Sequence, residues 1–590
     1  MWEAIKKNKA IAVFILFLII GLAIYANSLG NRFFWDDDDV IVNNAYVQNF
    51  EVGKMFSHSL ISGAGQISNY YRPVLLLSFS LDYFLWGLDP FGFNLLDVLL
   101  HILNAWLIFI LLYQLIELLR SKNNLFPFAD PPRPRGAPPA GGTPPEEGNF
   151  WLAFLPALVF LVHPLNTEAV DYVSARADVL YVFFALLSLI FYFNFSQAQE
   201  AKKKIINYSA AAGFFILSLL TKETAVVLPV LAVLLELVFL SPKAGWEKIK
   251  EAGKKTWPLF AILAVYIALH LTVLNFNNIN GALTGCLGDY CSYGVFKRSL
   301  VFLLAVLNYF KILFLPIGLH MERAVAEFGS IYSWKIFASS AVILLWAAAA
   351  IIFWKKEKII AFGFGWFFII LFPVSGILVK MNYPTYEHFL YLPMVGFWLA
   401  VFSLLSLLLR SRLGGRSNPA ESFENGAASS SSPSLGNWSW TPRNDNWAWT
   451  RVIFCVIIIA YSIFFGFLTI ERNRDWRDPI TFYEKNLKYS PQSYIEHNNL
   501  GMAYDAAGRF DEAIAQYRQA IAIKDAYPQV HSNLANSLAS ARQYAEAEKE
   551  YQRAIAMDQG FILPYQNLYN LYVYLGEKDK AGEVLKEINK

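Results

Sequence analysis

The chain has 590 residues, of which 56% are hydrophobic and only 16% are charged. This balance is too apolar for a soluble protein of that size and predicts a polytopic membrane protein. The formal net charge is +3, and no basic run is interleaved with aromatic residues, so we expect no nucleic-acid partner.

Twelve apolar segments are long enough, or nearly so, to form helices that cross a bilayer, which takes about 20 residues. Lysine and arginine concentrate in the cytoplasmic loops of membrane proteins, and here their distribution fits eleven crossings better than twelve. We therefore expect residues 298–316, which carry Asn308 and Lys311, to lie along the outer face or to re-enter from it. The segments lie near residues 10–28, 93–119, 150–163, 177–195, 205–220, 224–240, 257–275, 298–316, 334–354, 359–379, 389–409 and 451–470.

Four consecutive aspartates, Asp36 to Asp39, follow the first apolar segment directly. We expect that segment to be retained as a span, because no small-x-small cleavage pattern follows it. Ionised carboxylates cannot enter hydrocarbon, so the aspartates must lie at or beyond the membrane face, here the outer one. Four adjacent like charges commonly mark a solvated turn. The apolar residues on both sides, Phe33–Trp35 and Val40–Val42, instead favour a loop held against the bilayer surface and available for chemistry.

Two segments are predicted to be unstructured cytoplasmic linkers. Residues 127–145 are rich in Pro, Gly and Ala, and residues 414–446 are rich in Ser, Gly and Asn. Neither segment can bury enough apolar surface to offset the entropy lost on ordering.

A period of 34 residues runs through the sequence after residue 470. The segment His497–Gly501 recurs as His531–Ala535 and again as Tyr565–Tyr569. This spacing is typical of the tetratricopeptide repeat, a pair of antiparallel helices. We expect such pairs to stack into a solenoid whose concave groove binds extended peptide, with Pro479–Pro491 as the second helix of a degenerate leading repeat; an assembly scaffold is an equal alternative.

Polar residues gather in five short clusters where ordinary spans have none. In the expected topology all five fall at the outer ends of spans, which suggests a polar cavity that opens outward. The clusters are Asn69 to Pro73, His163 to Glu168, Ser174 to Asp178, Thr221 to Glu223 and Tyr386 to His388.

The motifs WDD, NAYV, YRP, DPFGFNL, HPLNTEAV, RAD, KE and LYLPMVGF occur in this order and precede the repeats. Together they resemble the transmembrane and tetratricopeptide-repeat-containing protein O-mannosyltransferases and their prokaryotic relatives. That family belongs to the C-type multi-span glycosyltransferases, which use lipid-phosphate sugars as donors. The resemblance implies an all-α fold, with a polytopic transmembrane helical bundle over residues 1–470 followed by an extracytoplasmic α-solenoid of repeats over residues 471–590.

The resemblance also implies an integral-membrane enzyme that moves a mannose-like hexose from a polyprenyl-phosphate donor to Ser/Thr hydroxyls of an extracytoplasmic protein. It places the acidic pair of the family on Asp36 and Asp37. A carboxylate can take the proton of the acceptor hydroxyl as the sugar carbon is attacked. We expect Asp36 to be this general base and Asp37 to orient it or to bind the acceptor. The expected location is a bacterial inner membrane, with the active site and the repeats on the extracytoplasmic face.

A lipid phosphate leaves as a stable anion and needs a cation more than an acid. Each candidate cation could instead be an interfacial residue that reaches lipid headgroups. His388 stands where the family usually has arginine, and the charge of histidine depends on pH near neutrality. The candidates for the donor phosphate are Arg72, Arg176, Lys222 and His388.

Other members of the polar clusters are candidates for substrate contact. For His163 and Glu168, a helix-end cap or a local hydrogen bond is an equal alternative. Asp38 and Asp39 fall where the family tolerates other residues, so we expect them to be solvated or to hold an optional divalent cation. The candidate substrate-binding residues are His163, Glu168, Asp178, Glu223 and Glu387.

Two other classes of function stay open. A non-catalytic membrane scaffold that gathers envelope proteins through its repeats would leave the acidic loop and the cations without a purpose. A transporter with intramembrane charges fits the sequence less well, because no inverted repeat is visible and the charges cluster at one face instead of the midplane.

Overall fold

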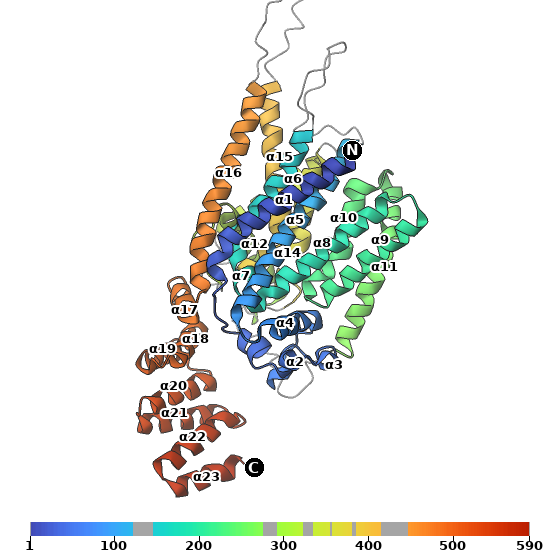
Figure 1. The fold of residues 1–590 in the computed structure, drawn as a ribbon. Helices are drawn as coiled ribbons and strands as arrows, with labels where there is room; N and C mark the ends of the chain where they lie inside the picture. The colour runs from blue at the N-terminus through green and yellow to red at the C-terminus, as the bar shows by residue number, and fades with distance from the viewer. Residues whose placement is uncertain are drawn as a thin grey trace, which may run out of the picture.

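Every regular element of the described chain is a helix, which confirms the predicted all-α fold. Figure 1 shows a bundle of long helices and, extending from one end of it, a row of short helices over residues 479–588. The predicted linkers near 127–145 and 414–446 lie outside the described residues, apart from their terminal residues Gly414 and Asn446. The structure, a computed structural model, describes residues 2–121, 146–274, 292–321, 334–353, 357–379, 385–414 and 446–588.

Each predicted apolar segment coincides with a helix or, at 224–240, with a run of short helical turns around α10. Within the described ranges, seven helices are long and apolar enough to span a membrane, or eight if the bent pair Phe150–Val162 and Pro164–Asp171 counts as one span. The number of crossings and the path of residues 298–316 stay predictions. The bundle helices are α1 (Trp2–Tyr25), α5 (Pro90–Ser121), α6 (Glu146–Val162), α8 (Arg176–Gln197), α9 (Ala201–Leu219), α10 (Leu228–Leu235), α11 (Gly245–Leu271), α12 (Val295–Phe314), α13 (Trp334–Phe353), α14 (Lys358–Leu371), α15 (Pro393–Gly414) and α16 (Asn446–Asn473).

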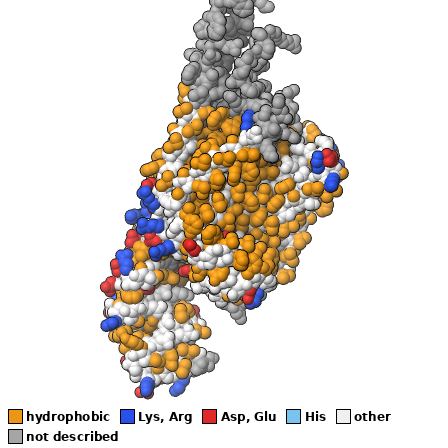
Figure 2. All heavy atoms as spheres, viewed as in Figure 1, with side chains coloured by type: hydrophobic (Ala, Val, Ile, Leu, Met, Phe, Trp, Pro, Cys, Tyr) orange, Lys and Arg blue, Asp and Glu red, His pale blue; other side chains and the backbone are white. Residues whose placement is uncertain are grey.

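The surface of the bundle is that of a membrane protein. Figure 2 shows a broad apolar face over the bundle, with most of the charged side chains on the repeats and at the margins. Large apolar side chains such as Phe84 and Phe337 are each 78% exposed. Exposed apolar area of this extent is favourable only where lipid or another apolar surface covers it.

Close packing inside the bundle depends on small residues. Helices α14 and α15 approach each other at Gly363 and Gly396, where a Cβ added to either residue would lie 2.5 Å from the carbonyl oxygen of the other. In lipid, helices gain little from the hydrophobic effect, so close backbone contact supplies the attraction between them. Trp366 packs beside this contact, and its Nε1 donates to Leu392 O at 3.0 Å.

The chain between α1 and α5 forms a small cap over one end of the bundle. It contains the aspartate loop and the helices α2 (Ala45–Gln48), α3 (Val52–Met55) and α4 (Pro73–Trp86). Val40 and Ile41 are buried in one apolar cluster with Phe79 and Phe93. The apolar residues after the aspartates therefore anchor the loop to α4 and α5.

The C-terminal helices form pairs with the predicted period of 34 residues. The first helices of the pairs begin at residues 494, 528 and 562, and the second at 510, 544 and 578. Within the first pair the ring of Tyr517 packs on Gly501, where an added Cβ would lie 2.6 Å from the ring. The helices are α17 (Pro479–Leu487), which occupies the position predicted for a degenerate leading repeat, then α18 (Tyr494–Ala506), α19 (Phe510–Ile523), α20 (Pro528–Ser540), α21 (Tyr544–Met557), α22 (Ile562–Leu575) and α23 (Lys578–Ile588).

An aromatic cluster, here named the docking cluster, joins the repeats to the cap; it consists of Phe34, Trp35, Tyr172, Trp476 and Phe482. Trp476, between α16 and α17, is fully buried, and its ring centroid lies 4.7 Å from that of Phe482 and 6.1 Å from that of Tyr172. The Phe34 and Phe482 centroids are 5.1 Å apart. The repeats and the aspartate loop therefore lie at the same end of the bundle (Figure 1).

Replacing Trp476 by Ala should loosen the repeats from the cap. Removing a buried tryptophan typically costs about 3–5 kcal/mol, because a cavity is left behind. We expect faster amide hydrogen exchange in α17 and in the aspartate loop together. Trp334→Ala, at a position that is 72% exposed, is the matched control and should leave both segments unchanged. Equal exchange in the two variants would show that the docking cluster does not couple the repeats to the loop.

Candidate functional site

The aspartate loop has an unusual backbone at its start. Trp35 has a φ of 60°, the left-handed region that bulky side chains rarely adopt. The Trp35 ring stacks on Tyr172, with centroids 5.8 Å apart and an interplanar angle of 24°. The aromatic packing therefore stabilises a sharp turn, after which Asp36 is exposed and Asp37 is buried.

Asp37 is the buried member of the pair. Its side chain is 1% exposed; Oδ2 accepts from Phe34 N at 3.1 Å, and Oδ1 accepts from Ser174 N at 2.8 Å and from Ser174 Oγ. Burial raises the pKa of Asp37 to about 7, although the hydrogen bonds from Ser174 and Phe34 oppose the rise. Asp37 thus ties the loop to the segment that precedes α8.

Asp36 is the exposed member. Its backbone N donates to Tyr172 Oη at 3.2 Å, and its side chain keeps accessible surface. Protein atoms nevertheless surround the Asp36 side chain closely, and this burial raises its pKa. A hydrogen bond from Tyr172 opposes the rise. The charge of Asp39 raises the pKa further, and the charge of Arg72 lowers it. Asp36 is therefore an accessible carboxyl group whose pKa is raised, with the cation Arg72 close enough to oppose the rise.

Two ion pairs lie at the start of the helical turn Glu223–Val227. The Arg72 guanidinium contacts Glu223 in a bidentate manner, with Nε–Oε1 at 3.2 Å and Nη2–Oε2 at 2.9 Å. Lys222 Nζ lies 2.7 and 2.6 Å from the two carboxylate oxygens of Asp178. Burial lowers the pKa of Arg72, but Glu223, and after it Tyr70 and Asp178, raise the pKa well above its usual range. The structure thus brings four of the predicted residues together, and the charge of one of them, Arg72, acts on Asp36.

Arg176 has a different environment from the other predicted cations. Its side chain is completely buried, and its guanidinium contacts the carboxylates of Asp82 and Asp97 and donates to Phe93 O at 2.9 Å. The guanidinium carbon also lies 4.6 Å from the Phe79 ring centroid. In this structure Arg176 joins α4, α5 and α8 and presents no surface to a ligand. Its predicted role in binding the donor stays a prediction.

A second polar group surrounds α7 (Thr167–Asp171), which follows α6 after a bend of 53°. Glu168 is fully buried; its Oε1 lies 2.6 Å from His388 Nδ1, and its Oε2 accepts from His388 N at 2.9 Å. Glu387 is also buried and lies 3.5 Å from Arg472 Nη2. This group borders the docking cluster, because Trp476 Nε1 donates to Thr167 Oγ1 at 3.3 Å.

His163 makes one local and one long-range hydrogen-bond contact. Its Nδ1 accepts from Leu165 N at 3.2 Å, and its Nε2 lies 3.0 Å from Leu313 O. This is the helix-end cap that the sequence left open as an alternative to substrate contact. Because His163 is buried and both of its ring nitrogens have partners, we infer that it stabilises the bend between α6 and α7.

The described part of the chain contains no group of three or more His, Cys, Asp or Glu residues suited to hold a metal ion. Asp38 is exposed, and Asp39 Oδ1 accepts from Gln66 Nε2 at 2.9 Å. These two carboxylates therefore lack a third acidic ligand among the described residues, and an ion there would depend on water or substrate for further ligands.

Sequence reasoning missed three residues that shape this region. Tyr172 belongs to the docking cluster and also accepts from the loop backbone at Asp36 N. Arg472 contacts Glu387, and Trp476 donates to Thr167, so both border the group around Glu168. A signal for Arg472 was present, since it is a basic residue at the end of the last apolar segment. No local pattern marked its partners, because Glu387 is 85 residues away in sequence.

Comparison with known proteins points to one group of enzymes. A protein O-mannosyl-transferase of Caenorhabditis elegans is 23% identical over 534 residues, covering 89% of this chain and 65% of that protein. TMTC4 of Homo sapiens is 24% identical over 415 residues, covering 64% of this chain and 53% of that protein. The chain resembles the protein O-mannosyl-transferases. The resemblance inferred from the order of the motifs is therefore confirmed.

Two further findings define the extent of this resemblance. The protein O-mannosyl-transferase TMTC1 of Homo sapiens is 30% identical over 234 residues, which cover 37% of this chain and 23% of that protein. A family profile described as TPR repeat matches residues 501–541, in agreement with the predicted repeats. The chain spans about half to two thirds of the length of the relatives that it matches over most of its sequence.

The raised pKa of Asp37 predicts a pH dependence of stability. Unfolded aspartate has a pKa of about 3.9, whereas Asp37 in the folded chain has a pKa of about 7. Between these values the folded state holds a proton that the unfolded chain has released, so the stability contributed by this group falls as pH rises from about 4 to 7. Asp37→Asn cannot ionise and should show a smaller loss of melting temperature between pH 5 and pH 7.5.

The control for this measurement is Asp89→Asn, which changes an exposed aspartate at the start of α5. It should keep the pH dependence of the unaltered protein. If Asp37→Asn and the unaltered protein lost melting temperature in parallel over this range, Asp37 would not be the group that titrates.

Proposed function

We propose that the chain is an integral-membrane glycosyltransferase that moves a mannose-like hexose from a polyprenyl-phosphate donor to Ser/Thr hydroxyls of an extracytoplasmic protein. The observation that carries the proposal is the pair of adjacent carboxyl groups, accessible Asp36 and buried Asp37, held beside Arg72 where the repeats dock. The similarity to protein O-mannosyl-transferases supports the reaction type.

Asp36 is the general base in this proposal. The acceptor hydroxyl oxygen attacks the anomeric carbon on the side opposite the phosphate, and its proton passes to the Asp36 carboxylate. The bond between the anomeric carbon and the phosphate oxygen breaks, and the lipid phosphate leaves with the bonding electrons. The configuration at the sugar carbon is inverted. Asp37 acts as a positioning residue, because its hydrogen bonds to Phe34 and Ser174 fix the turn that presents Asp36.

The phosphate is stabilised by cations in this proposal. Arg72 uses Nε and Nη2 to hold Glu223, and Nη1 has no bond to the described residues, so it is available to a phosphate oxygen. Lys222 lies beside it, paired with Asp178. His388 holds Glu168 through Nδ1, which leaves Nε2 for a ligand. Glu223, Asp178 and Glu168 then orient the cations instead of contacting substrate.

The domain division and orientation belong to the same proposal. Residues 1–470 form the membrane part, and residues 471–590 form the repeat part, with α16 ending at Asn473. The lysine distribution favours an orientation in which the docked repeats and the aspartate loop face the extracytoplasmic side together. A bacterial inner membrane is the proposed location.

Asp36→Asn should lower the rate of hexose transfer by about 10² to 10⁴, the usual effect of removing a positioned base. Donor binding should persist, since the cations are unchanged. Asp38→Asn, at an exposed position in the same loop, is the control and should keep most of the rate. Turnover of each purified variant with a matched lipid-phosphate sugar measures this. A near-normal rate in Asp36→Asn, with a collapse in Asp38→Asn, would overturn the assignment.

The repeats are proposed to supply affinity for the acceptor polypeptide. Asn499, Asn533 and Asn567 recur at the 34-residue period on α18, α20 and α22, and each is partly exposed. Asn533 Nδ2 donates to Asn498 Oδ1 at 3.2 Å, and Asn567 Nδ2 donates to Asn536 Oδ1 at 2.9 Å, so amide side chains of neighbouring repeats contact each other in pairs. An amide side chain offers both a donor and an acceptor, which suits the backbone of an extended peptide more than any particular side chain.

The double variant Asn533→Ala/Asn567→Ala should raise the KM for a protein acceptor about tenfold, since a net hydrogen bond contributes about 0.5–1.5 kcal/mol. The kcat should stay unchanged, because these bonds are made equally in the ground state and the transition state. Gln552→Ala, on the exposed face of α21, is the control. A fall in kcat with KM unchanged would show that the repeats do not act through acceptor affinity.

A further inference from the structure

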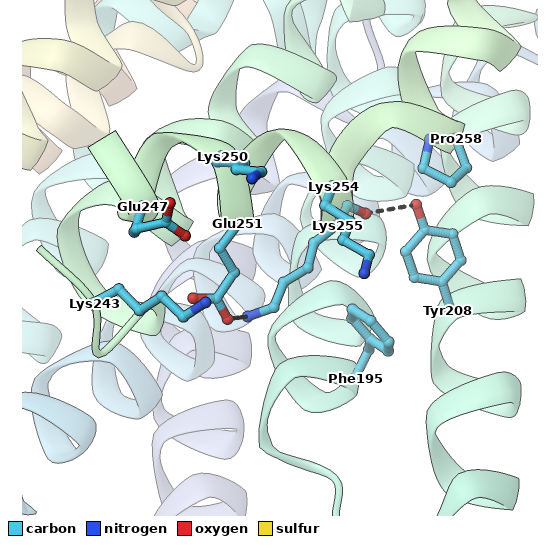
Figure 3. A pocket seen from close by; sticks show the side chains of 9 residues that line it. All are labelled: Phe195, Tyr208, Lys243, Glu247, Lys250, Glu251, Lys254, Lys255 and Pro258. Carbon is cyan, nitrogen blue, oxygen red and sulfur yellow. Dashed lines mark hydrogen bonds and ion pairs between the residues drawn. The ribbon is translucent and has the colours of Figure 1, made fainter. Parts of the chain in front are cut away.

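A pocket with a volume of about 670 Å³ lies between the end of α8, the start of α9 and the first half of α11 (Figure 3). Residues 247, 250, 251, 254, 255 and 258 of α11 recur at three- and four-residue spacing, so they share one face of the helix. Phe195, Tyr208 and Pro258 supply apolar surface to the lining. Tyr208 Oη donates to Lys255 O at 3.1 Å, which fixes α9 against α11.

The lining carries an excess of positive charge: four lysines against two glutamates. Lys255 is already used, since its Nζ lies 3.1 Å from Glu236 Oε2 and 3.2 Å from Glu251 Oε1. Glu251 also accepts from Ser241 Oγ at 2.9 Å. Lys250 and Lys254 make no ion pair with the described residues, so their ammonium groups are available to an anion that enters the pocket.

The same helix places the pocket at a membrane interface. Trp246 and Trp257 are 73% and 61% exposed on the faces of α11 that do not line the pocket, and Ile249 is 52% exposed between them. Tryptophan is enriched at the level of the lipid headgroups, where its ring is apolar and its N–H is solvated. The lysine face and the tryptophan faces together fit a helix that enters the bilayer beside lipid headgroups.

This pocket is separate from the aspartate loop. Arg176 and Phe195 lie near opposite ends of α8, and 19 residues at 1.5 Å per residue separate them by about 28 Å. Figure 2 shows charged side chains at the corner where α8 and α9 meet, next to the apolar face of the bundle. A ligand here therefore takes no part in chemistry at Asp36.

We propose that this pocket binds the phosphate group of an anionic membrane phospholipid, with Lys250 and Lys254 as its principal contacts and Phe195 and Pro258 against the glycerol and the first acyl carbons. Basic pockets between membrane helices bind such headgroups through charge, and each lysine near the surface raises the affinity about fivefold. The site would hold α9 and α11 together in the membrane and does not depend on the transfer activity.

The test uses the purified full-length chain in neutral detergent, titrated with dioctanoyl phosphatidylglycerol and followed by native mass spectrometry. We expect saturable binding that is much tighter than that of dioctanoyl phosphatidylcholine. Lys250→Gln/Lys254→Gln should weaken it about twentyfold. Lys250→Arg/Lys254→Arg should retain it, since the charges are kept. Unchanged phosphatidylcholine binding and melting temperature in both variants would confirm that each is folded.

The matched control is Lys202→Gln/Lys204→Gln, which removes two exposed lysines at the start of α9 that do not line the pocket. It should bind phosphatidylglycerol normally. Equal weakening by the control pair would overturn the proposal in favour of diffuse surface charge. Competition by millimolar inorganic phosphate as effective as that by the lipid would overturn the assignment to a lipid, because the apolar part of the lining would then contribute nothing.

Discussion

The buried carboxyl group of Asp37 is the constraint on which the candidate site depends. Taking a carboxyl group out of water is unfavourable unless hydrogen bonds replace the lost hydration. Asp37 receives these bonds from Phe34 on its own loop and from Ser174 ahead of α8. They join the loop after the first membrane helix to the segment that precedes α8, and they fix the direction in which Asp36 points. A loop of four aspartates without this anchor would be a solvated turn.

The repeats support the loop from the opposite side. Phe34 and Trp35 pack on Phe482 of α17, and Trp476 stacks on Tyr172 and donates to Thr167 of α7. The leading helix of the repeats is therefore part of the structure that holds the carboxylates, and the later pairs extend away from it (Figure 1). In the proposed enzyme, acceptor bound along the repeats would be delivered to the end of the bundle where Asp36 lies. The docking cluster gives a physical reason for both parts to occur in one chain.

Much of the fold could be predicted from the sequence because its signals are local. Hydropathy over about 20 residues marked the bundle helices, and the 34-residue period marked the helix pairs. The contacts of the candidate site could not be predicted in the same way, because they join residues that are far apart in sequence. The role predicted for Arg176 in binding the donor phosphate stays a prediction, and nothing in the sequence pointed to its carboxylate partners Asp82 and Asp97, which lie 94 and 79 residues away. Periodicity reports which residues share a face of a helix and contains no information on such distant pairs.

The central claim is that the accessible carboxyl group of Asp36, in the loop after the first helix, activates a hydroxyl for attack on a lipid-phosphate sugar. The most direct measurement is NMR of the product formed by the purified full-length chain from a polyprenyl-phosphate mannose of known anomeric configuration and a Ser/Thr-containing acceptor. The account predicts a mannosylated hydroxyl with the anomeric configuration opposite to that of the donor. A product that retains the configuration of the donor, or no transfer by a chain shown to bind both substrates, would contradict it.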